Sequence, residues 1–251
     1  MLVAQESDQH VQSFSRGLKV IKAFTGSPLT LSEVAARAEL SPAATRRYLA
    51  TLVELGYLAQ EGSVFRVRSK LLELSKPYLE ASDPVRKAAP ILRRLSAEVR
   101  ETTTLTQYSH GRVINLHACH ADQELSIRVN VGSYLPVYCT AMGRAMLGML
   151  DDAEVESVLE SIDRPKLTPH TKTEVSSIME EVRKARAQGY CLAEEEHTLG
   201  IRTLSVPVDL LQGSLVALSV PTPTARESRT DYVDRVLPQL LKAAEKMADK
   251  D

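Results

Sequence analysis

The stretch LSEVAARAELSPAATRRYLATLVELGYL, residues 31–58, decides the fold of the N-terminal part of this chain. Residues 31–38 form one short amphipathic segment, and a second begins after Ser41. Ser41 can cap the second helix, and Pro42 suits its first position, where a backbone N–H would have no partner. Two helices joined this tightly form either a helical hairpin in a core or a helix-turn-helix that reads DNA.

The flanking sequence favours the second alternative. Residues 16–24 (RGLKVIKAF) have apolar residues at helical spacing and predict a helix before the pair. Gly56 ends the last helix, and residues 57–59 and 64–68 predict two strands around the turn Glu61-Gly62-Ser63. Three helices followed by a two-stranded hairpin predict a winged helix-turn-helix.

Charge is distributed unevenly, although the net charge is only −1. Residues 16–70 contain nine Lys and Arg against four Asp and Glu, and the remainder contains 22 against 28. A basic N-terminal quarter on an acidic body is typical of a DNA-binding domain attached to a sensor domain.

The outer face of the third helix carries the candidate DNA-reading residues. Thr45, Leu49 and Leu52 share its inner face. An arginine on the outer face can donate two hydrogen bonds to a guanine, and the helix start favours phosphate. The alternative is that these arginines are only solvated. The candidates are Ser41, Ala43, Arg46, Arg47 and, on the hairpin, Arg66, with Arg16, Lys19 and Arg68 as further phosphate contacts.

The rest of the chain predicts a linker and a second domain. We expect a disordered lead-in at residues 1–13, the winged helix-turn-helix at 14–68, a linker helix at 69–83 and an effector-binding domain at 84–251. Ser82-Asp83-Pro84 marks the boundary, because the residue before a proline disfavours helix. Strands are predicted at 102–109, 112–119 and 124–131, and later near 190–196, 202–208 and 215–220. Because strands and helices are grouped, we expect an α+β domain on an antiparallel sheet.

Composition excludes several classes of protein. No apolar run reaches 18 residues, and the first ten residues lack the pattern of a signal peptide. Three widely spaced cysteines suit a reducing compartment better than a disulfide framework. We therefore expect a cytoplasmic protein without a membrane partner.

Other residue constellations are weaker candidates. His117, Cys119 and His120 could bind a metal, but on a strand His120 points away from the other two, and no fourth ligand follows at a suitable spacing. Glu194-Glu195-Glu196 could suggest acid–base catalysis, and Cys139 near a helix start could be reactive. A solvated edge and a packing cysteine are the simpler interpretations. No phosphate loop, dinucleotide fingerprint or nucleophile elbow occurs, so we expect no cofactor and no enzyme.

The chain resembles the IclR family of bacterial transcription regulators from Phe14 to about Ala248. The resemblance rests on residues 31–58, on VGSYLPVYCTAMGRAML (131–147) and on RAQGYCLAEEEHTLGIRTLSVPV (186–208). The stretches YCTAMGR and TPHTKT are most similar to regulators of protocatechuate and 4-hydroxybenzoate catabolism. The resemblance implies a GAF-like effector domain, a homodimer or tetramer, and a pseudo-palindromic operator on double-stranded DNA.

The resemblance also implies an effector site. Backbone N–H groups at Ala141 and Met142 would bind a carboxylate, since a helix start has free donors. Arg128, on the strand predicted at 124–131, and Arg202 are further carboxylate partners, with a surface arginine and an ion pair to Glu195 or Glu196 as the alternatives. Side chains from the late strands would complete the site: Ala193, Thr203, Ser219 and Pro221.

These observations predict a transcription regulator whose DNA binding is controlled by a small carboxylic acid, with an aromatic acid or its catabolite as the expected effector. A non-aromatic acid is the alternative within the same class. An enzyme that acts on an aromatic acid is the alternative from another class.

Overall fold

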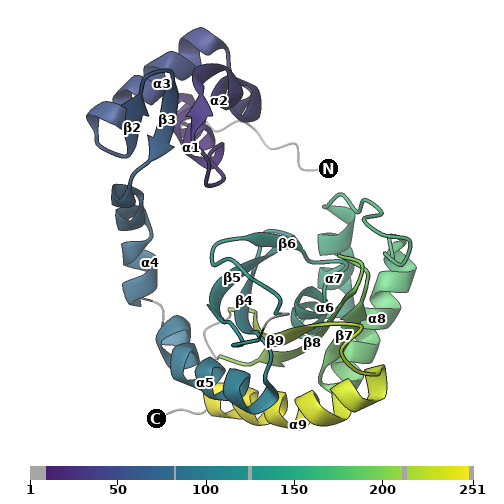
Figure 1. Cartoon of the computed structure of the whole chain (residues 1–251). Coiled ribbons are helices and arrows are strands. Elements are labelled where there is room, and N and C mark those ends of the chain that lie inside the picture. Colours follow the sequence, from purple (N-terminus) through teal and green to yellow (C-terminus); the bar gives the residue numbers. More distant parts are fainter. Residues whose placement is uncertain (1–9, 82, 124–125, 211–213, 249–251) are drawn as a thin grey trace. The chain divides into compact units, whose positions relative to one another are not determined.

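The computed structural model describes residues 10–81, 83–123, 126–210 and 214–248 (Figure 1). The chain divides into two compact units, Met1–Ala81 and Ser82–Asp251. We call them the head and the effector unit and describe each by itself. None of the helices in the described residues combines the length and the apolar character needed to cross a membrane.

Three helices form the body of the head: α1 (Gln12–Lys22), α2 (Leu31–Ala38) and α3 (Pro42–Glu54). The start of α2 is held by a capping box between Thr30 and Glu33. Ser41 caps α3 as predicted, because its hydroxyl accepts a hydrogen bond from the N–H of Ala44 at 3.3 Å. The helices close over one apolar core, whose fully buried members are Val20, Val34 and Leu49.

The wing is a three-stranded sheet in the order β1-β3-β2. The predicted hairpin is present as β2 (Leu58–Glu61) and β3 (Val64–Val67), with Glu61 opposite Val64. The third strand, β1 (Leu29–Thr30), was not predicted because two residues carry no periodic signal. It pairs Leu29 with Phe65 and so joins the wing to the start of α2.

The expected disordered lead-in requires a correction. Residues 1–9 lie outside the described residues, but Gln12 and Ser13 belong to α1. The helix begins one turn early because the carbonyl of Val11 accepts hydrogen bonds from the N–H groups of Phe14 and Ser15. Val11 itself provides no side-chain cap.

The continuous linker helix predicted at 69–83 is also wrong in detail. Residues Ser69–Leu74 form a 3-10 helix, and Lys76–Ala81 form the separate helix α4. Pro77 explains the break, because proline has no N–H to donate to the carbonyl of residue 73 and its ring clashes there. Ser82 lies outside the described residues.

The effector unit contains a six-stranded antiparallel sheet in the order β6-β5-β4-β9-β8-β7. The chain-order bounds are β4 (Thr103–Ser109), β5 (Arg112–Cys119), β6 (Tyr134–Pro136), β7 (Cys191–Glu194), β8 (Ile201–Val208) and β9 (Val216–Pro223). The predicted antiparallel α+β architecture is therefore confirmed.

The strand predicted at 124–131 is wrong. Residues 126–131 have no regular structure, and the strand that pairs with β5 is β6. One hydrogen bond ties this segment to the residue before β4, since the Ile127 carbonyl accepts from the Thr102 hydroxyl at 2.7 Å. Gly132, at φ +82°, turns the chain before β6 begins. Residues 124 and 125 lie outside the described residues.

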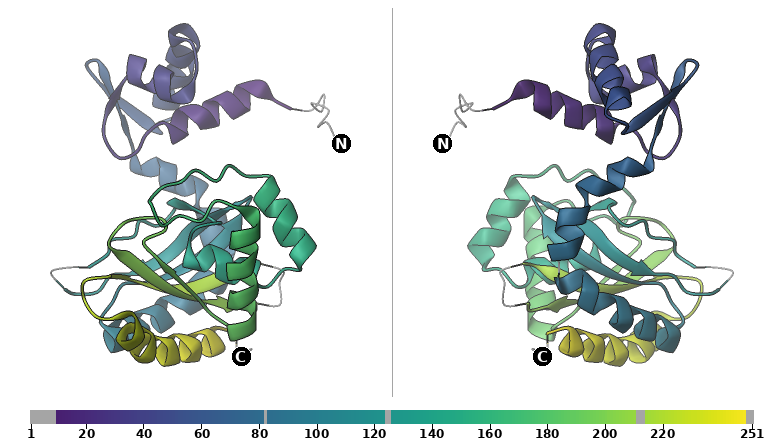
Figure 2. Two further views of the ribbon diagram at one scale, coloured as in Figure 1. Left: turned by 90° about the vertical axis from the view of Figure 1, so that its right-hand side faces the viewer. Right: turned by 90° about the vertical axis from the view of Figure 1, so that its left-hand side faces the viewer.

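Helices cover the two faces of the sheet differently (Figures 1 and 2). Helices α5 (Asp83–Val99) and α9 (Arg229–Ala248) pack side by side on one face. Helix α6 (Ala141–Leu147) packs on the other face, and α8 (Val175–Gln188) packs against α6 and α7 (Asp152–Glu160).

The side chains of the sheet alternate accordingly. The face toward α5 and α9 carries large apolar residues, such as Leu105, Leu204 and Leu218. The face toward α6 carries small or polar residues, such as Thr104 on β4 and Ser205 on β8. Both of these residues pair with Ser219 on β9, the strand between them. Small side chains under a short helix leave space on this face, and the candidate site lies there.

Candidate functional site

A cavity of about 250 Å³ lies on the α6 face of the sheet. Its wall combines the sheet, the start of α6 and two irregular segments, residues 127–130 and 195–198. Ligand sites for drug-sized molecules span about 300–1,000 Å³, so this cavity suits a smaller molecule. Besides the residues discussed below, the wall contains Ile127, Val129, Leu135, His197, Thr198 and Ile201.

The start of α6 borders the cavity. Thr140 caps this helix: its hydroxyl accepts from the N–H of Gly143 at 3.3 Å and donates to the carbonyl of Pro136 at 2.7 Å. A Cβ at Gly143 would lie 2.1 Å from the carbonyl oxygen of Val137, so only glycine allows this close approach. The N–H groups of Ala141 and Met142, at the first two helical positions, have no acceptor within the helix.

A buried ion pair connects α6 to the opposite wall. The guanidinium of Arg144 donates to both carboxylate oxygens of Glu196, at 2.5 and 2.6 Å, and to the carbonyl of Tyr138 at 2.8 Å. Arg144 is fully buried and Glu196 is 7% exposed. In this geometry the pair holds the segment that follows β7 against α6.

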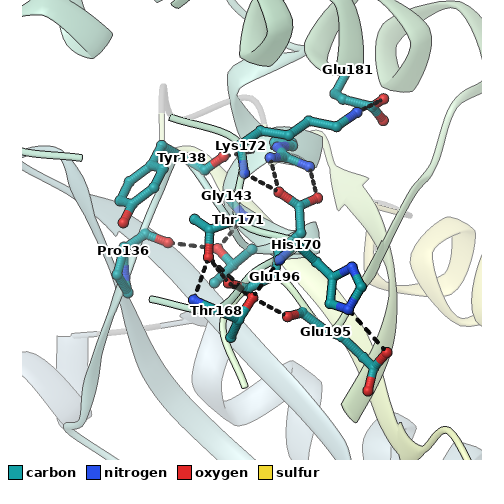
Figure 3. Close-up of polar contacts among 12 residues, drawn as sticks. Pro136, Tyr138, Gly143, Thr168, His170, Thr171, Lys172, Glu181, Glu195 and Glu196 are labelled. Carbon is teal, nitrogen blue, oxygen red and sulfur yellow. Dashed lines mark hydrogen bonds and ion pairs between the residues drawn. The ribbon is translucent and has the colours of Figure 1, made fainter. Parts of the chain in front are cut away.

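Two threonines fix the same segment from outside the sheet. The hydroxyl of Thr168 donates to the carbonyl of Glu195, and that of Thr171 donates to the carbonyl of Glu196, each at 2.6 Å. The N–H of Lys172 donates to the Glu196 carboxylate at 3.2 Å. Figure 3 shows Thr168 and Thr171 close to the backbone of both glutamates. These contacts involve the predicted TPHTKT stretch, whose structural role had no signal in the sequence.

Two polar atoms in the cavity wall are buried without a partner. The hydroxyl of Thr104, on β4, and the side-chain oxygen of Asn115, on β5, make no hydrogen bond within the described part of the chain. Each residue is only 2% exposed. Buried polar groups normally find a partner, so these atoms indicate a ligand or bound water. Sequence reasoning missed both residues.

Most of the predicted effector residues lie in this wall: Ala141, Met142, Ala193, Thr203, Pro221 and Arg128. Arg128 lies in the irregular segment rather than on a strand; it is exposed and forms no ion pair with any described residue. Ser219 does not line this cavity. It lies two residue pairs further along the sheet than Pro221 and is fully buried, and its hydroxyl is 2.9 Å from that of Ser205.

Arg202 is not a carboxylate partner in the cavity. It points to the opposite face of β8 from Thr203, as strand alternation requires. Its guanidinium pairs with Glu194 at 2.8 Å and lies 5.7 Å from the ring centroid of Tyr232. The structural ion pair was therefore the right alternative, with Glu194 in place of Glu195 or Glu196.

Of the cysteines in the weaker candidate sites, Cys119 is half-buried and Cys139 is buried. Within the described residues, no three His, Cys, Asp or Glu side chains gather as metal ligands would. The sulfur of Cys119 lies 3.8 Å from Nε2 of His117, and burial raises the pKa of this thiol. Burial raises the pKa of Cys139 to about 11, which disfavours the reactive thiolate.

The predicted DNA-reading face is exposed on α3. Ala43, Arg46 and Arg47 are all exposed, opposite the buried Thr45 and Leu49.

On the wing, Arg66 is also exposed and forms a surface ion pair with Glu61 at 3.1 Å. Such a pair is weak in water and can exchange for a phosphate contact.

The two units together define a class of protein: a winged helix-turn-helix joined to a domain with a small ligand cavity. Residues 76–249 match the family described as "Bacterial transcriptional regulator IclR C-terminal", and residues 13–62 match the "IclR helix-turn-helix domain". The chain belongs to the IclR family of DNA-binding transcription regulators. It is a regulator and not an enzyme.

Two known relatives indicate which kind of regulator within the family this chain is similar to. The chain is 33% identical to the Pca regulon regulatory protein of Pseudomonas putida, over 92% of this chain and 81% of that protein. It is 29% identical to the p-hydroxybenzoate hydroxylase transcriptional activator of Acinetobacter baylyi, over 96% and 92% of the two chains. Both support the predicted similarity to regulators of aromatic acid catabolism.

A solved structure supports the fold. It is an IclR homologue from Microbacterium hydrocarbonoxydans in complex with 4-hydroxybenzoate, with a TM-score of 0.78 and 24% identity. The match covers 94% of this chain and 97% of the other.

Proposed function

We propose that a small aromatic carboxylic acid binds in the cavity of the effector unit and controls operator binding by the head. The observation that carries this proposal is the cavity, which is lined by Ala141 and Met142 at the start of α6 and by Arg128, an arginine that forms no ion pair with any described residue. Helix N–H groups and arginine both favour a carboxylate. The Pca and p-hydroxybenzoate regulators and the 4-hydroxybenzoate-bound homologue support an aromatic effector.

In this proposal the residues of the cavity wall have different roles in binding the acid. The N–H groups of Ala141 and Met142 hold the carboxylate, and Arg128 closes over it from the edge. The small side chains of Ala193, Thr203 and Pro221 leave space for a ring. A larger or charged side chain at Ala193 would fill that space and repel an anion.

For DNA we propose that α3 lies in the major groove. Arg46 and Arg47 contact base edges, Ala43 allows close approach, Ser41 is near phosphate, and Arg66 contacts the backbone from the wing. Residues 14–68 form this DNA-binding domain, residues 69–83 join it to the effector domain at 84–251, and a homodimer or tetramer binds a pseudo-palindromic operator in the cytoplasm. Effector and operator are coupled if the acid binds the DNA-competent state and its alternative with different affinity.

The effector class can be tested by thermal unfolding of the full chain with a panel of acids. The panel contains protocatechuate, 4-hydroxybenzoate, benzoate, β-ketoadipate, pyruvate and glyoxylate. A ligand at about 100 times its Kd stabilises the native state by about 2.7 kcal/mol, so an aromatic acid should raise the Tm in a concentration-dependent way.

A matched variant, Ala141→Pro, removes one of the carboxylate donors at a helix position where proline is tolerated and should reduce this rise. A rise with an aliphatic acid alone would leave the regulator class intact and contradict the aromatic effector.

A further inference from the structure

We propose that Asn115 and Thr104 form a subsite that binds a hydroxyl group of the effector, and that this hydroxyl acts as a hydrogen-bond donor. The inference rests on the proposed effector site and adds the chemistry of the part of the cavity wall formed by β4 and β5. It would make the natural ligand a hydroxylated aromatic acid instead of an unsubstituted one.

The orientation of the Asn115 amide follows from a chain of hydrogen bonds. The hydroxyl of Ser133 donates to the carbonyl of Asn130 at 2.6 Å, so its proton is already engaged. Toward Asn115 the Ser133 oxygen can therefore only accept, and it does so from the amide nitrogen at 3.0 Å. This leaves the amide oxygen of Asn115, a residue of the cavity wall, as a buried acceptor without a donor among the described residues.

The position of Asn115 follows from the pairing of β4 with β5. Asn115 pairs with Thr106 in the continuous register that runs from the hairpin, and residues directly opposite each other lie on the same face of the sheet. Asn115 therefore shares the face of Thr106 and, by alternation along β4, the face of Thr104. The two unpartnered side chains thus come from adjacent strands and line one cavity.

The backbone holds this arrangement independently of the side chain. The N–H of Asn115 donates to the carbonyl of Ser133 at 3.0 Å, and its carbonyl accepts from the N–H of Gly132 at 2.7 Å. A change of the Asn115 side chain therefore leaves the connection between β5 and the segment before β6 in place.

An amide oxygen selects among ligand groups. A carboxylate can only accept, so it would repel this oxygen, whereas a hydroxyl can donate to it. The Thr104 hydroxyl can accept or donate and can serve the same ligand group. A ligand without a donor leaves the buried Asn115 oxygen unsatisfied, and sites of this kind reject such analogues strongly.

Calorimetric titration of the full chain tests the subsite. The hydroxybenzoate isomer with the lowest Kd is compared with the fluorobenzoate and the aminobenzoate substituted at the same position. We expect the fluoro compound, which cannot donate, to bind at least about tenfold more weakly. The amino compound, which retains a donor, should lie between them.

Variants assign the effect to these residues. In Asn115→Leu the Kd of the fluoro acid divided by the Kd of the hydroxy acid should fall to near one, and Thr104→Val should reduce this ratio less. Thr106→Val is the matched control: Thr106 is buried on the same face of β4, donates to the Ala217 carbonyl at 3.2 Å and does not line the cavity. Its ratio should equal that of the unchanged protein.

Two outcomes would overturn the inference. If the fluoro and hydroxy acids bind equally to the unchanged protein, or if Asn115→Leu keeps the full ratio, the subsite does not bind a hydroxyl, although the effector site stands. If no aromatic acid binds at all, the proposed effector class fails together with the subsite. The comparison of ligands on the unchanged protein needs no variant to fold.

Discussion

Replacing Arg144 by alanine should destabilise the effector unit by about 3–5 kcal/mol, because the change leaves the buried Glu196 carboxylate without its cation. The pair makes two short hydrogen bonds, and Arg144 is fully buried. The carbonyl of Tyr138 loses its donor as well. The measurement is amide hydrogen exchange in α6 and β7, which reports the stability of the effector unit alone. A chain of two units need not unfold in one global transition, so a single Tm would not isolate this effect.

Two controls distinguish the loss of this buried ion pair from the loss of a positive charge at any position. Arg183→Ala removes an exposed arginine that pairs with Asp152 at 2.8 Å and should cost less than about 1 kcal/mol. Changing Arg144→Met together with Glu196→Leu should recover much of the stability, since apolar residues of similar volume replace a buried pair well. An effect of Arg144→Ala as small as that of Arg183→Ala would show that the pair does not hold α6.

Replacing Arg47 by alanine should weaken operator binding by about 1–3 kcal/mol, or roughly 5- to 150-fold, if Arg47 contacts a guanine. Preference for one base pair of each half-site should relax at the same time. If Arg47 instead contacts a phosphate, its loss should lower the affinity for all sequences equally. It should also reduce the slope of log K against log salt concentration by about one. Fluorescence anisotropy with duplexes selected by the protein from a random pool distinguishes the two.

Arg112→Ala provides the matched control for Arg47. Arg112 is an exposed arginine at the start of β5, in the effector unit. Its removal changes net charge equally and should leave operator affinity unaltered. Equal affinities of Arg47→Ala and Arg112→Ala for every duplex would exclude Arg47 as a base-reading residue.

Local signals were sufficient to predict the head. The bounds of α2, the cap at Ser41 and the buried face of α3 all follow from side chains within one or two turns. Strand β1 could not be predicted, because its two residues become a strand only by pairing with β3. Thr30 pairs with Val64, 34 positions away, and Leu29 pairs with Phe65, 36 positions away.

The cavity depends more on long-range contacts. The family resemblance suggested Thr203 and Pro221, which pair with each other on the cavity face, and strand alternation explains why Arg202 points away from it. Ser219 lies outside the cavity wall, on strand β9, which packs against α6. Asn115 was missed because the partner that orients its amide, Ser133, lies 18 positions away in the sequence. The pairing of Arg144 with Glu196 joins residues 52 positions apart, and neither has a local sequence signal.

The most direct test of the regulator is the linkage between the two units in the full chain. Operator affinity is measured by anisotropy without and with saturating hydroxybenzoate, and the Kd of the acid is measured by calorimetry without and with operator. Coupling free energies are typically about 1–3 kcal/mol, so we expect both constants to change roughly 5- to 150-fold and by the same factor. An acid that binds tightly while operator affinity stays unchanged would contradict effector control of DNA binding.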